Sequence, residues 1–86
     1  MEFKGVVGSQ RRITIPRVYV LADALSEGEL VEVSLSESAT EEESNFLTHI
    51  QRGFRIQVPK VEYESMHLNE GSVVDVDVER VKKEKG

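Results

Sequence analysis

Six cationic side chains stand in two short clusters, and both clusters have a similar layout. The clusters are Arg11, Arg12 and Arg17 in the first half, and Arg52, Arg55 and Lys60 in the second. In each cluster an arginine opens an Arg-Ile-x-(Ile/Val)-Pro stretch, and the last cation directly follows the proline. The planar guanidinium of arginine suits phosphate oxygens and the edges of guanine bases. These residue types therefore indicate recognition of an anionic partner rather than catalysis.

The clusters recur because most of the chain repeats itself. Residues 3–35 and 46–78 align without a gap at a constant offset of 43 positions, and ten of the 33 aligned pairs are identical. Such a repeat indicates one supersecondary unit used twice. Two copies predict a closed pair related by a pseudo-twofold axis. The axis would bring the two cationic clusters to related loops, as one composite basic patch.

Length and composition predict one small domain without cysteine chemistry. The chain has 86 residues and no cysteine, which excludes disulfides, thiolate metal sites and a cysteine nucleophile. No apolar run approaches the roughly 20 residues of a membrane-spanning helix. The first residues also lack the basic and apolar regions of a signal peptide. We therefore expect a cytoplasmic protein with no membrane partner.

Charge is distributed unevenly along the chain. The net charge of −5 argues against nonspecific attachment to nucleic acid. However, residues 1–25 and 46–63 each sum to +2, whereas residues 26–45 sum to −7 and residues 64–81 to −4. In each repeat the N-terminal part is thus basic and the C-terminal part acidic. Such local fields guide docking more than the total charge does.

Each repeat predicts the order strand, strand, short helix, strand, because period-two alternation gives way to helical spacing after the proline. The expected strands are 2–7, 12–15, 31–35, 46–50, 54–58 and 74–78, and the expected helices are two turns after Pro16 and residues 61–67. Gly8, Ser9 and Gln10 are typical of a turn, in which the glycine allows a positive φ. The domain is residues 1–86, made of repeats 3–35 and 46–78 with an exposed linker at 36–45 and a frayed tail at 80–86.

Six short strands leave vulnerable edges unless they close into a barrel. The fold class is therefore mainly β, a six-stranded pseudo-twofold barrel with two short helices. Its expected inner layer is Ile13, Ile15, Val31, Val33, Leu35, Ile56, Val58, Val74, Val76 and Val78. The expected plugs at the two ends are Val18, Leu25, Val61 and Leu68.

The doubled motif resembles the AbrB/SpoVT family of bacterial and archaeal transition-state regulators and antitoxins. The matching stretches are 12–16 (Arg-Ile-Thr-Ile-Pro), 27–28 (Glu-Gly) and 31–33 (Val-Glu-Val), and then 55–59, 70–71 and 74–76. The resemblance implies a cradle-loop barrel, of the RIFT or double-psi type. Two copies in one chain are most similar to small archaeal RIFT-type barrels, which favours the RIFT strand order.

The same resemblance implies DNA binding and transcription regulation. Arg12 and Arg55 match the arginine that contributes to DNA contact in AbrB-like proteins. The helices depart from the family because they lack its additional basic residues. The positions concerned hold Tyr19, Val20, Leu21, Glu62, Tyr63 and Glu64. We therefore expect weak DNA binding, or binding that needs oligomers.

Other interpretations of the cationic residues stay open. Arg12 and Arg55 could instead pair with carboxylates such as Glu32 or Asp75 on neighbouring strands. The rival function is a noncatalytic adaptor barrel that binds a protein partner, which a net charge of −5 suits. A monomer is expected if the two repeats of one chain pair with each other. The alternative is a strand-swapped dimer, in which they pair with the repeats of a second chain.

Catalysis, metal ions and cofactors are not expected. The only two histidines, His49 and His67, are not equivalent in the repeat, and no His-x-His or His-x-x-x-His pair is present. Both are interpreted as surface residues. No glycine-rich phosphate loop is present either.

Overall fold

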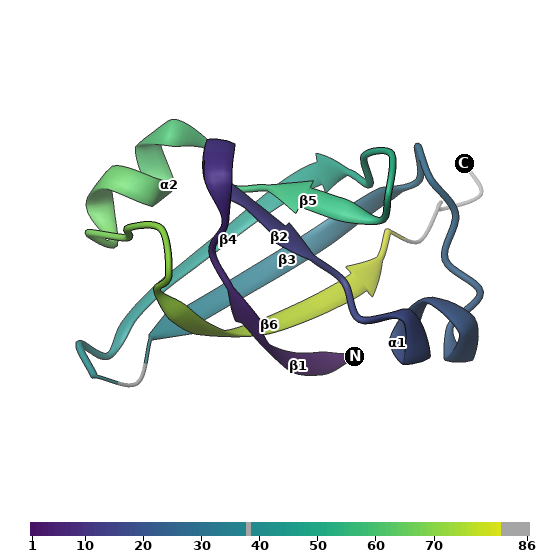
Figure 1. Ribbon diagram of the computed structural model, residues 1–86, viewed down its shortest axis with the longest axis horizontal. Helices are drawn as coiled ribbons and strands as arrows, with labels where there is room; N and C mark the ends of the chain where they lie inside the picture. The colour runs from purple at the N-terminus through teal and green to yellow at the C-terminus, as the bar shows by residue number, and fades with distance from the viewer. Residues whose placement is uncertain (38, 82–86) are drawn as a thin grey trace, which may run out of the picture.

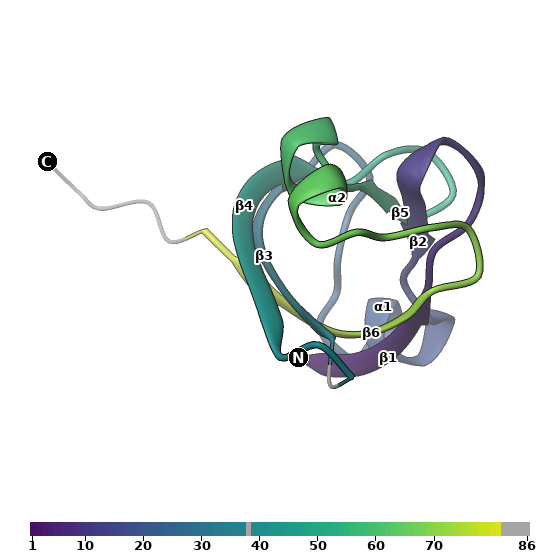
Figure 2. The same ribbon diagram turned by 90° about the vertical axis from the view of Figure 1, so that its left-hand side faces the viewer.

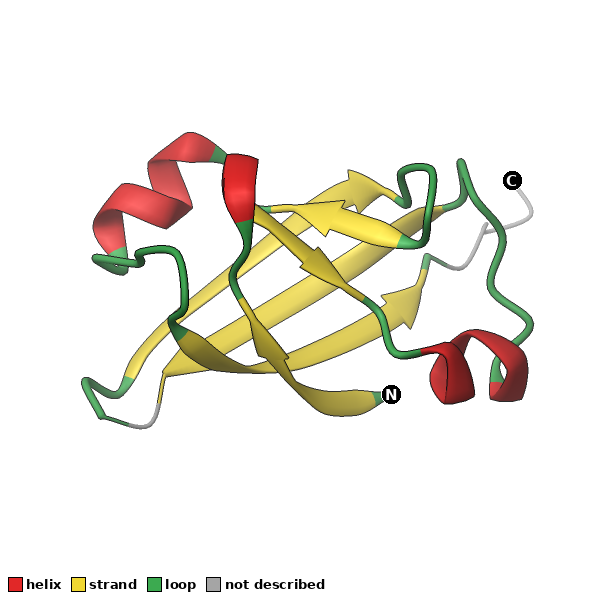
Figure 3. Cartoon of the chain, viewed as in Figure 1, coloured by secondary structure: helices red, strands yellow, loops and turns green. Residues whose placement is uncertain are grey.

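The structure is a computed structural model that describes residues 1–37 and 39–81. The strands of this described part are β1 (Glu2–Val6), β2 (Arg12–Thr14), β3 (Leu30–Glu37), β4 (Glu42–His49), β5 (Arg55–Gln57) and β6 (Val73–Arg80). The helices are α1 (Arg17–Ala22) and α2 (Lys60–Ser65), and a 3₁₀ turn, η1 (Ser9–Arg11), precedes β2. Each half runs strand, strand, helix, strand, in the predicted order (Figure 1; Figure 3).

The strands form two antiparallel sheets. One sheet has four strands in the order β1-β6-β3-β4, and the other pairs β2 with β5. The prediction of a mainly β fold with six strands and two short helices is confirmed. Within the described residues no strand ladder joins the two sheets into a closed barrel. Viewed along the long axis, the sheets lie on either side of a common core (Figure 2).

Strands pair across the two repeats rather than within them. The first strand of the first repeat, β1, pairs with β6 of the second, with Phe3 opposite Val76. Reciprocally, β4 of the second repeat pairs with β3 of the first, with Phe46 opposite Val33. Each of these residues lies 43 positions from its counterpart. The two halves are therefore interlocked through their backbones.

Loop hydrogen bonds repeat this reciprocity. Ile15 N donates to Phe54 O at 2.8 Å, and Val58 N donates to Arg11 O at 2.8 Å. Two self-equivalent pairs mark the pseudo-twofold axis, because their members are 43 positions apart and directly opposite each other. They are Ser34 with Asp77 in the four-stranded sheet, and Ile13 with Ile56 in the two-stranded sheet.

One apolar core fills the space between the sheets. All ten residues of the predicted inner layer are buried, with at most 2% of their surface exposed. Strand alternation accounts for this, since successive side chains of β3 and β6 point to opposite faces and the valines and Leu35 share the inner one.

The predicted end plugs are half wrong. Leu25 and Leu68 are buried, but Val18 and Val61 are exposed on the outer faces of α1 and α2. Each helix has only six residues, so only a narrow side of it faces the core. That side carries Val20 in α1, and it carries Tyr63 in α2.

The predicted linker, 36–45, is largely strand. Ser36 pairs with Glu43 and Glu37 pairs with Glu42, so β3 and β4 form one long hairpin. Backbone ladder bonds need no apolar side chains, and a Ser- and Glu-rich composition therefore did not reveal them.

Two smaller predictions also change. Arg80, assigned to the frayed tail, is the last residue of β6, and residues 82–86 of that tail lie outside the described part. Gly8 has an extended backbone with φ −99°. Gln10 and Arg11 instead hold the left-handed conformation in that loop, with φ of 57° and 58°. Side-chain-bearing residues tolerate this region less readily than glycine, and the loop geometry enforces it here.

None of the described helices has the length and apolarity to cross a membrane.

Candidate nucleic-acid interface

The two-stranded sheet, β2 with β5, forms a short ribbon that carries the central arginines. Ile13 and Ile56 face each other across it and are fully buried. The alternation of a strand turns the flanking residues to the opposite, outer face. These are Arg12, opposite Gln57, and Arg55, opposite Thr14. The outer face of the ribbon thus presents two arginines, a glutamine and a threonine.

Arg12 and Arg55 are brought together, as the repeat predicts. They lie diagonally across the ribbon, on either side of the Ile13–Ile56 pair. Diagonal neighbours on an antiparallel pair are about 7–8 Å apart, within reach of long side chains. The Nε atom of Arg12 is buried and has no hydrogen-bond partner among the described residues.

Arg11 and Arg52 lie in the loops that lead into the ribbon. Arg11 Nε donates to the carbonyl oxygen of Val58 at 3.0 Å, which ties its loop to the other repeat. Arg55 Nε donates to the carbonyl oxygen of Arg52 at 3.2 Å. Each bond uses one guanidinium nitrogen, so the side chains of Arg11 and Arg55 both retain further N–H donors.

Arg17 and Lys60 lie apart from each other. Arg17 begins α1 and Lys60 begins α2, and the two helices occupy opposite ends of the molecule (Figure 1; Figure 2). Lys60 Nζ lies 4.0 Å from the carboxylate of Glu64 one turn along α2. The six predicted residues therefore form a central ribbon with one cation beyond each end, rather than a single compact patch.

Pairing of Arg12 or Arg55 with strand carboxylates is not observed. Glu32 and Asp75 belong to the four-stranded sheet, and Asp75 accepts a hydrogen bond from Lys4 Nζ at 2.8 Å. Among the described residues, no ion pair within 4.0 Å includes either arginine. That alternative is wrong for this structure.

The segments that form the ribbon and its flanks contain no carboxylate of their own, although Glu27 accepts a hydrogen bond from Gly53 N and Glu64 lies 4.0 Å from Lys60 Nζ. Segments 8–17 and 51–60 hold all six predicted cations and no aspartate or glutamate. Their pairing as β2 and β5 places these two carboxylate-free segments side by side. The region therefore has a locally positive field although the whole chain is acidic.

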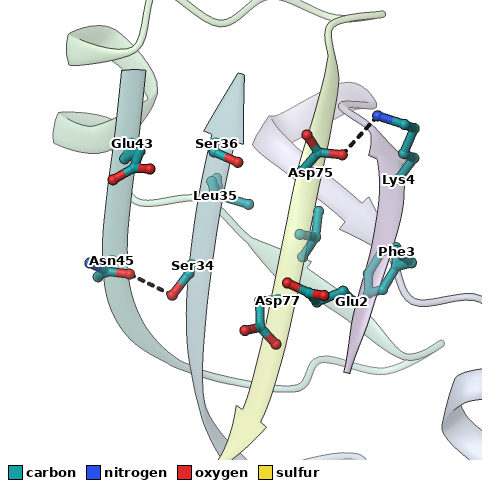
Figure 4. A pocket seen from close by; sticks show the side chains of 11 residues that line it. Glu2, Phe3, Lys4, Ser34, Leu35, Ser36, Glu43, Asn45, Asp75 and Asp77 are labelled. Carbon is teal, nitrogen blue, oxygen red and sulfur yellow. Dashed lines mark hydrogen bonds and ion pairs between the residues drawn. The ribbon is translucent and has the colours of Figure 1, made fainter. Parts of the chain in front are cut away.

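The outer face of the four-stranded sheet has the opposite character. A shallow hollow of about 560 Å³ crosses β4, β3, β6 and β1 (Figure 4). Its lining includes Glu2, Glu43, Asp75 and Asp77, against the single cation Lys4. Carboxylates thus predominate on the outer face of the four-stranded sheet, whereas the two-stranded sheet carries arginines and no carboxylate.

One structural ion pair was missed by the sequence analysis. Arg80 Nε donates to the carboxylate of Glu29, and its Nη2 donates to the carbonyl oxygens of Asp23 and Ala24 at 2.9 and 3.0 Å. The hydrogen bond from Arg80 holds the pKa of Glu29 below its ordinary value of 4.5. Arg80 ties the end of β6 to the segment after α1. Nothing in the spacing of these residues signals the contact, because 51 positions separate the partners.

The histidines lie on the surface, as interpreted from the sequence. His49 and His67 are exposed, and His67 Nδ1 lies 3.4 Å from the carboxylate of Glu42. Among the described residues, no group of three or more histidine, cysteine, aspartate or glutamate side chains is placed to hold a metal ion.

Comparison with known proteins gives a likeness in fold. No family model matches the chain, and no curated protein matches it. The chain is similar to the solution structure of PHS018 from Pyrococcus horikoshii, with a TM-score of 0.85 and 22% sequence identity. The similarity covers 99% of this chain and 95% of that one. At this level of identity the likeness concerns the fold alone.

Proposed function

We propose that this protein binds double-stranded DNA through the outer face of the β2–β5 ribbon and its flanking loops, as an AbrB-like transcription regulator. The observation that carries the proposal is the pairing of two carboxylate-free segments that together hold six cations. Among the described residues, Lys60 has a carboxylate within 4.0 Å, that of Glu64, whereas the five arginines have none and stay available to a polyanion. The resemblance of the doubled motif to the AbrB/SpoVT family supports the same function.

The geometry of the ribbon supports DNA as the polyanion. A two-stranded β-ribbon fits the major groove of B-DNA, and arginine and glutamine are the side chains that read guanine and adenine there. Arg12, Arg55 and Gln57 project from the ribbon in this way, while Arg17 and Lys60 extend the cationic track beyond its two ends. The ribbon strands are only three residues long, so few base pairs are contacted.

The affinity is expected to be modest. A handful of phosphate contacts gives dissociation constants of about 10⁻⁴–10⁻⁶ M at physiological salt. Glu62 and Glu64 on α2 repel phosphate near the Lys60 end. The acidic outer face of the four-stranded sheet orients the molecule, because it turns away from DNA while the ribbon approaches.

A salt-dependent duplex-binding assay tests the proposal. Fluorescence anisotropy of a labelled duplex is measured over a range of salt concentrations for the wild type and for an Arg12→Ala/Arg55→Ala variant. Removing two cations from the interface should reduce the slope of log Kobs against log salt by about 2, because fewer counterions are released on binding. Lys4→Ala is the control, since it removes an exposed cation from the opposite sheet. No binding at low salt, or equal slopes for wild type and double variant, rejects the proposal.

We also propose that the two sheets are parts of one cradle-loop barrel of the RIFT type. The reciprocal bonds Ile15 N to Phe54 O and Val58 N to Arg11 O support it, since each repeat reaches across to the other. Full closure requires β1 to pair with β2 and β4 with β5. Slow exchange of the outward amides of β1 and β4, with contacts to β2 and β5 in nuclear Overhauser spectra, tests it. Fast exchange at both edges contradicts it.

The second candidate is a noncatalytic adaptor that binds a basic protein partner. The acidic hollow on the four-stranded sheet favours it, because Glu2, Glu43, Asp75 and Asp77 face one side (Figure 4). Amide-shift titrations separate the candidates, since duplex DNA should shift the amides of β2 and β5, whereas a basic partner should shift those of β3 and β6. A monomer is proposed for either function, and light scattering on the purified chain tests it.

A further inference from the structure

An apolar groove runs beside α1, away from the acidic hollow. It has a volume of about 810 Å³ and is bounded by α1, the segment that leads into the helix, and the loop between β4 and β5. Leu21, Ala24 and Phe54 contribute its apolar surface, and Arg17 stands at its edge. The volume lies within the range of small-molecule pockets, about 300–1,000 Å³.

The two ends of the molecule pack different side chains against the core. At the α2 end, Tyr63 packs against the core and Met66 is buried. The positions that correspond to them at the α1 end hold Val20, which is smaller, and Asp23, which is exposed. Tyr19 packs against the core at the α1 end instead, one position away in the repeat, where it stacks on Phe3, and the groove lies beside Val20.

The groove is apolar well beyond what the fold requires. Leu21, Ala24 and Phe54 correspond to Glu64, His67 and Arg11 at the α2 end, where the backbone has the same conformation. The fold therefore tolerates polar residues at these positions, yet Leu21 keeps 67% of its surface exposed. Exposed apolar surface gathered along a groove is typical of a binding site.

Charge indicates the kind of ligand. Arg17 makes no ion pair within 4.0 Å among the described residues, and the lining of the groove contains no carboxylate. Glu27 is held beside the groove by a hydrogen bond from Gly53 N to its Oε2 at 2.5 Å, and Asp23, between the lining residues Leu21 and Ala24, does not itself line the groove. A cation beside an apolar surface complements a molecule with an apolar body and one anionic group.

We propose that this groove binds a small apolar ligand that carries a carboxylate, with its apolar part against Leu21 and Phe54 and its carboxylate at Arg17. The site shares Thr14 and Arg17 with the ribbon and its flank, but its apolar part lies beside α1, and binding at it requires no DNA. The carboxylate gains a charge-assisted hydrogen bond from the guanidinium, and the apolar part covers the exposed apolar surface of Leu21 and Phe54.

Decanoate is a suitable probe of this site. In an amide-shift titration without DNA, decanoate should shift the amides of Leu21, Ala24 and Phe54, and not those of α2. Decyltrimethylammonium has the same chain length and the opposite charge, so it should bind at least severalfold more weakly. Equal binding of the two amphiphiles, shifts spread over the whole surface, or no shifts overturns the proposal.

Three variants sharpen the test. Leu21→Glu places the residue of the α2 end into the groove and should weaken decanoate binding roughly tenfold or more, because apolar contact is lost and a like charge is added. Arg17→Ala should weaken it about two- to fivefold, as expected for an exposed ion pair. Val18→Glu is the matched control, since Val18 is on the same helix with 65% exposure but does not line the groove.

The variants also remain informative about folding. Leu21 and Val18 are both exposed, so neither substitution should unfold the protein, and circular dichroism checks this. Val20→Tyr fills the groove from inside by copying Tyr63, and it should abolish the decanoate shifts without adding charge. Unchanged decanoate affinity in both Leu21→Glu and Val20→Tyr contradicts the proposed site, whatever the outcome of the DNA experiments.

Discussion

The α1 end and the α2 end share a backbone and differ in chemistry. Ala24 and His67 both adopt the left-handed conformation, with φ of 52° and 55°, and each helix closes with an equivalent hydrogen bond to the following leucine. These bonds are Leu25 N to Val20 O at 3.0 Å and Leu68 N to Tyr63 O at 3.1 Å. Around this common frame, one end has an apolar groove, and the other is packed by Tyr63 and Met66 and carries polar residues on its surface.

The difference shows which positions determine the fold. Matching residues of the strands, such as Ile13 with Ile56 and Val33 with Val76, are buried, and their burial directs the strand pairing. Matching residues on the helices need not be, since Val18 and Val61 are both exposed, and Leu21 and Glu64 differ and are exposed at both ends. The duplicated frame is thus maintained by its core, while the surfaces of the two copies are free to take different functions.

The largest expected effect on stability comes from a charge placed in the core, at equivalent positions of the two repeats. Val33→Asp and Val76→Asp each place a carboxylate in the core beside the sheet axis, and each should prevent folding, because a buried unpaired charge costs several kcal/mol. Circular dichroism and urea titration measure this. Glu32→Ala, on the exposed face of the same strand, should change the free energy of unfolding by less than about 0.5 kcal/mol. A folded Val76→Asp protein would mean that the second repeat is not needed for the common core.

Gly5→Ala tests a position where the repeats are not equivalent. An added Cβ would lie 2.7 Å from Ile13 Cγ2 and 3.1 Å from Val76 Cγ2, whereas the second repeat accommodates Thr48 at the corresponding position. Overpacking should lower the free energy of unfolding by about 1–3 kcal/mol. Thr48→Ala is the comparison and should cost less in the same urea titration. Equal losses for the two variants would show that β1 shifts to make room.

Arg80→Ala tests a contact found only at the α1 end. Loss of the bonds to Glu29, Asp23 and Ala24 should lower the free energy of unfolding by about 1–2 kcal/mol at neutral pH. Because the folded-state pKa of Glu29 lies below 4.5, the stabilisation is complete above that pH and is lost as the pH falls through the lower folded-state pKa. Urea titrations over this range should show the gap between wild type and Glu29→Gln closing in acid. If the difference in unfolding free energy between wild type and Glu29→Gln does not depend on pH, the Arg80–Glu29 ion pair does not contribute to stability in this way.

Gly28→Ala and Gly71→Ala form a matched pair with the smallest expected effect. Both glycines have positive φ, 87° and 92°, and no other atom lies near an added Cβ. The backbone strain alone should therefore cost about 1 kcal/mol in each variant. Thermal unfolding of the two variants compares the two turns directly. Losses that differ by more than the measurement error would reveal an asymmetry that the backbone does not show.

Much of the fold was predictable from period-two alternation and from the repeat. The valines of β3 and β6 and the isoleucines of β2 and β5 are buried as predicted, because strand geometry assigns alternate residues to one face. The extension of β3 and β4 into the Ser- and Glu-rich segment was not predictable. Ladder hydrogen bonds there join Ser36 to Glu43 and Glu37 to Glu42, with no apolar signal.

The candidate sites were predictable only in part. The repeat correctly placed Arg12 and Arg55 on a shared face, but it gave no means of locating Arg17 and Lys60 at opposite ends, since this depends on where the helices pack. The groove beside α1 was not foreseen either. It depends on which side of α1 faces the core and on how the loop before β5 packs beside the helix, and the sequence pattern specifies neither.

The pairing of β1 with β6 has a consequence for how the chain is made. Glu2 lies opposite Asp77, so β1 gains its ladder partner only after β6 has left the ribosome. Contacts between residues so distant in sequence slow folding, because the intervening chain must close into a loop first. The nascent chain therefore leaves β1 unpaired with β6 while the 66 residues between these two strands are synthesised.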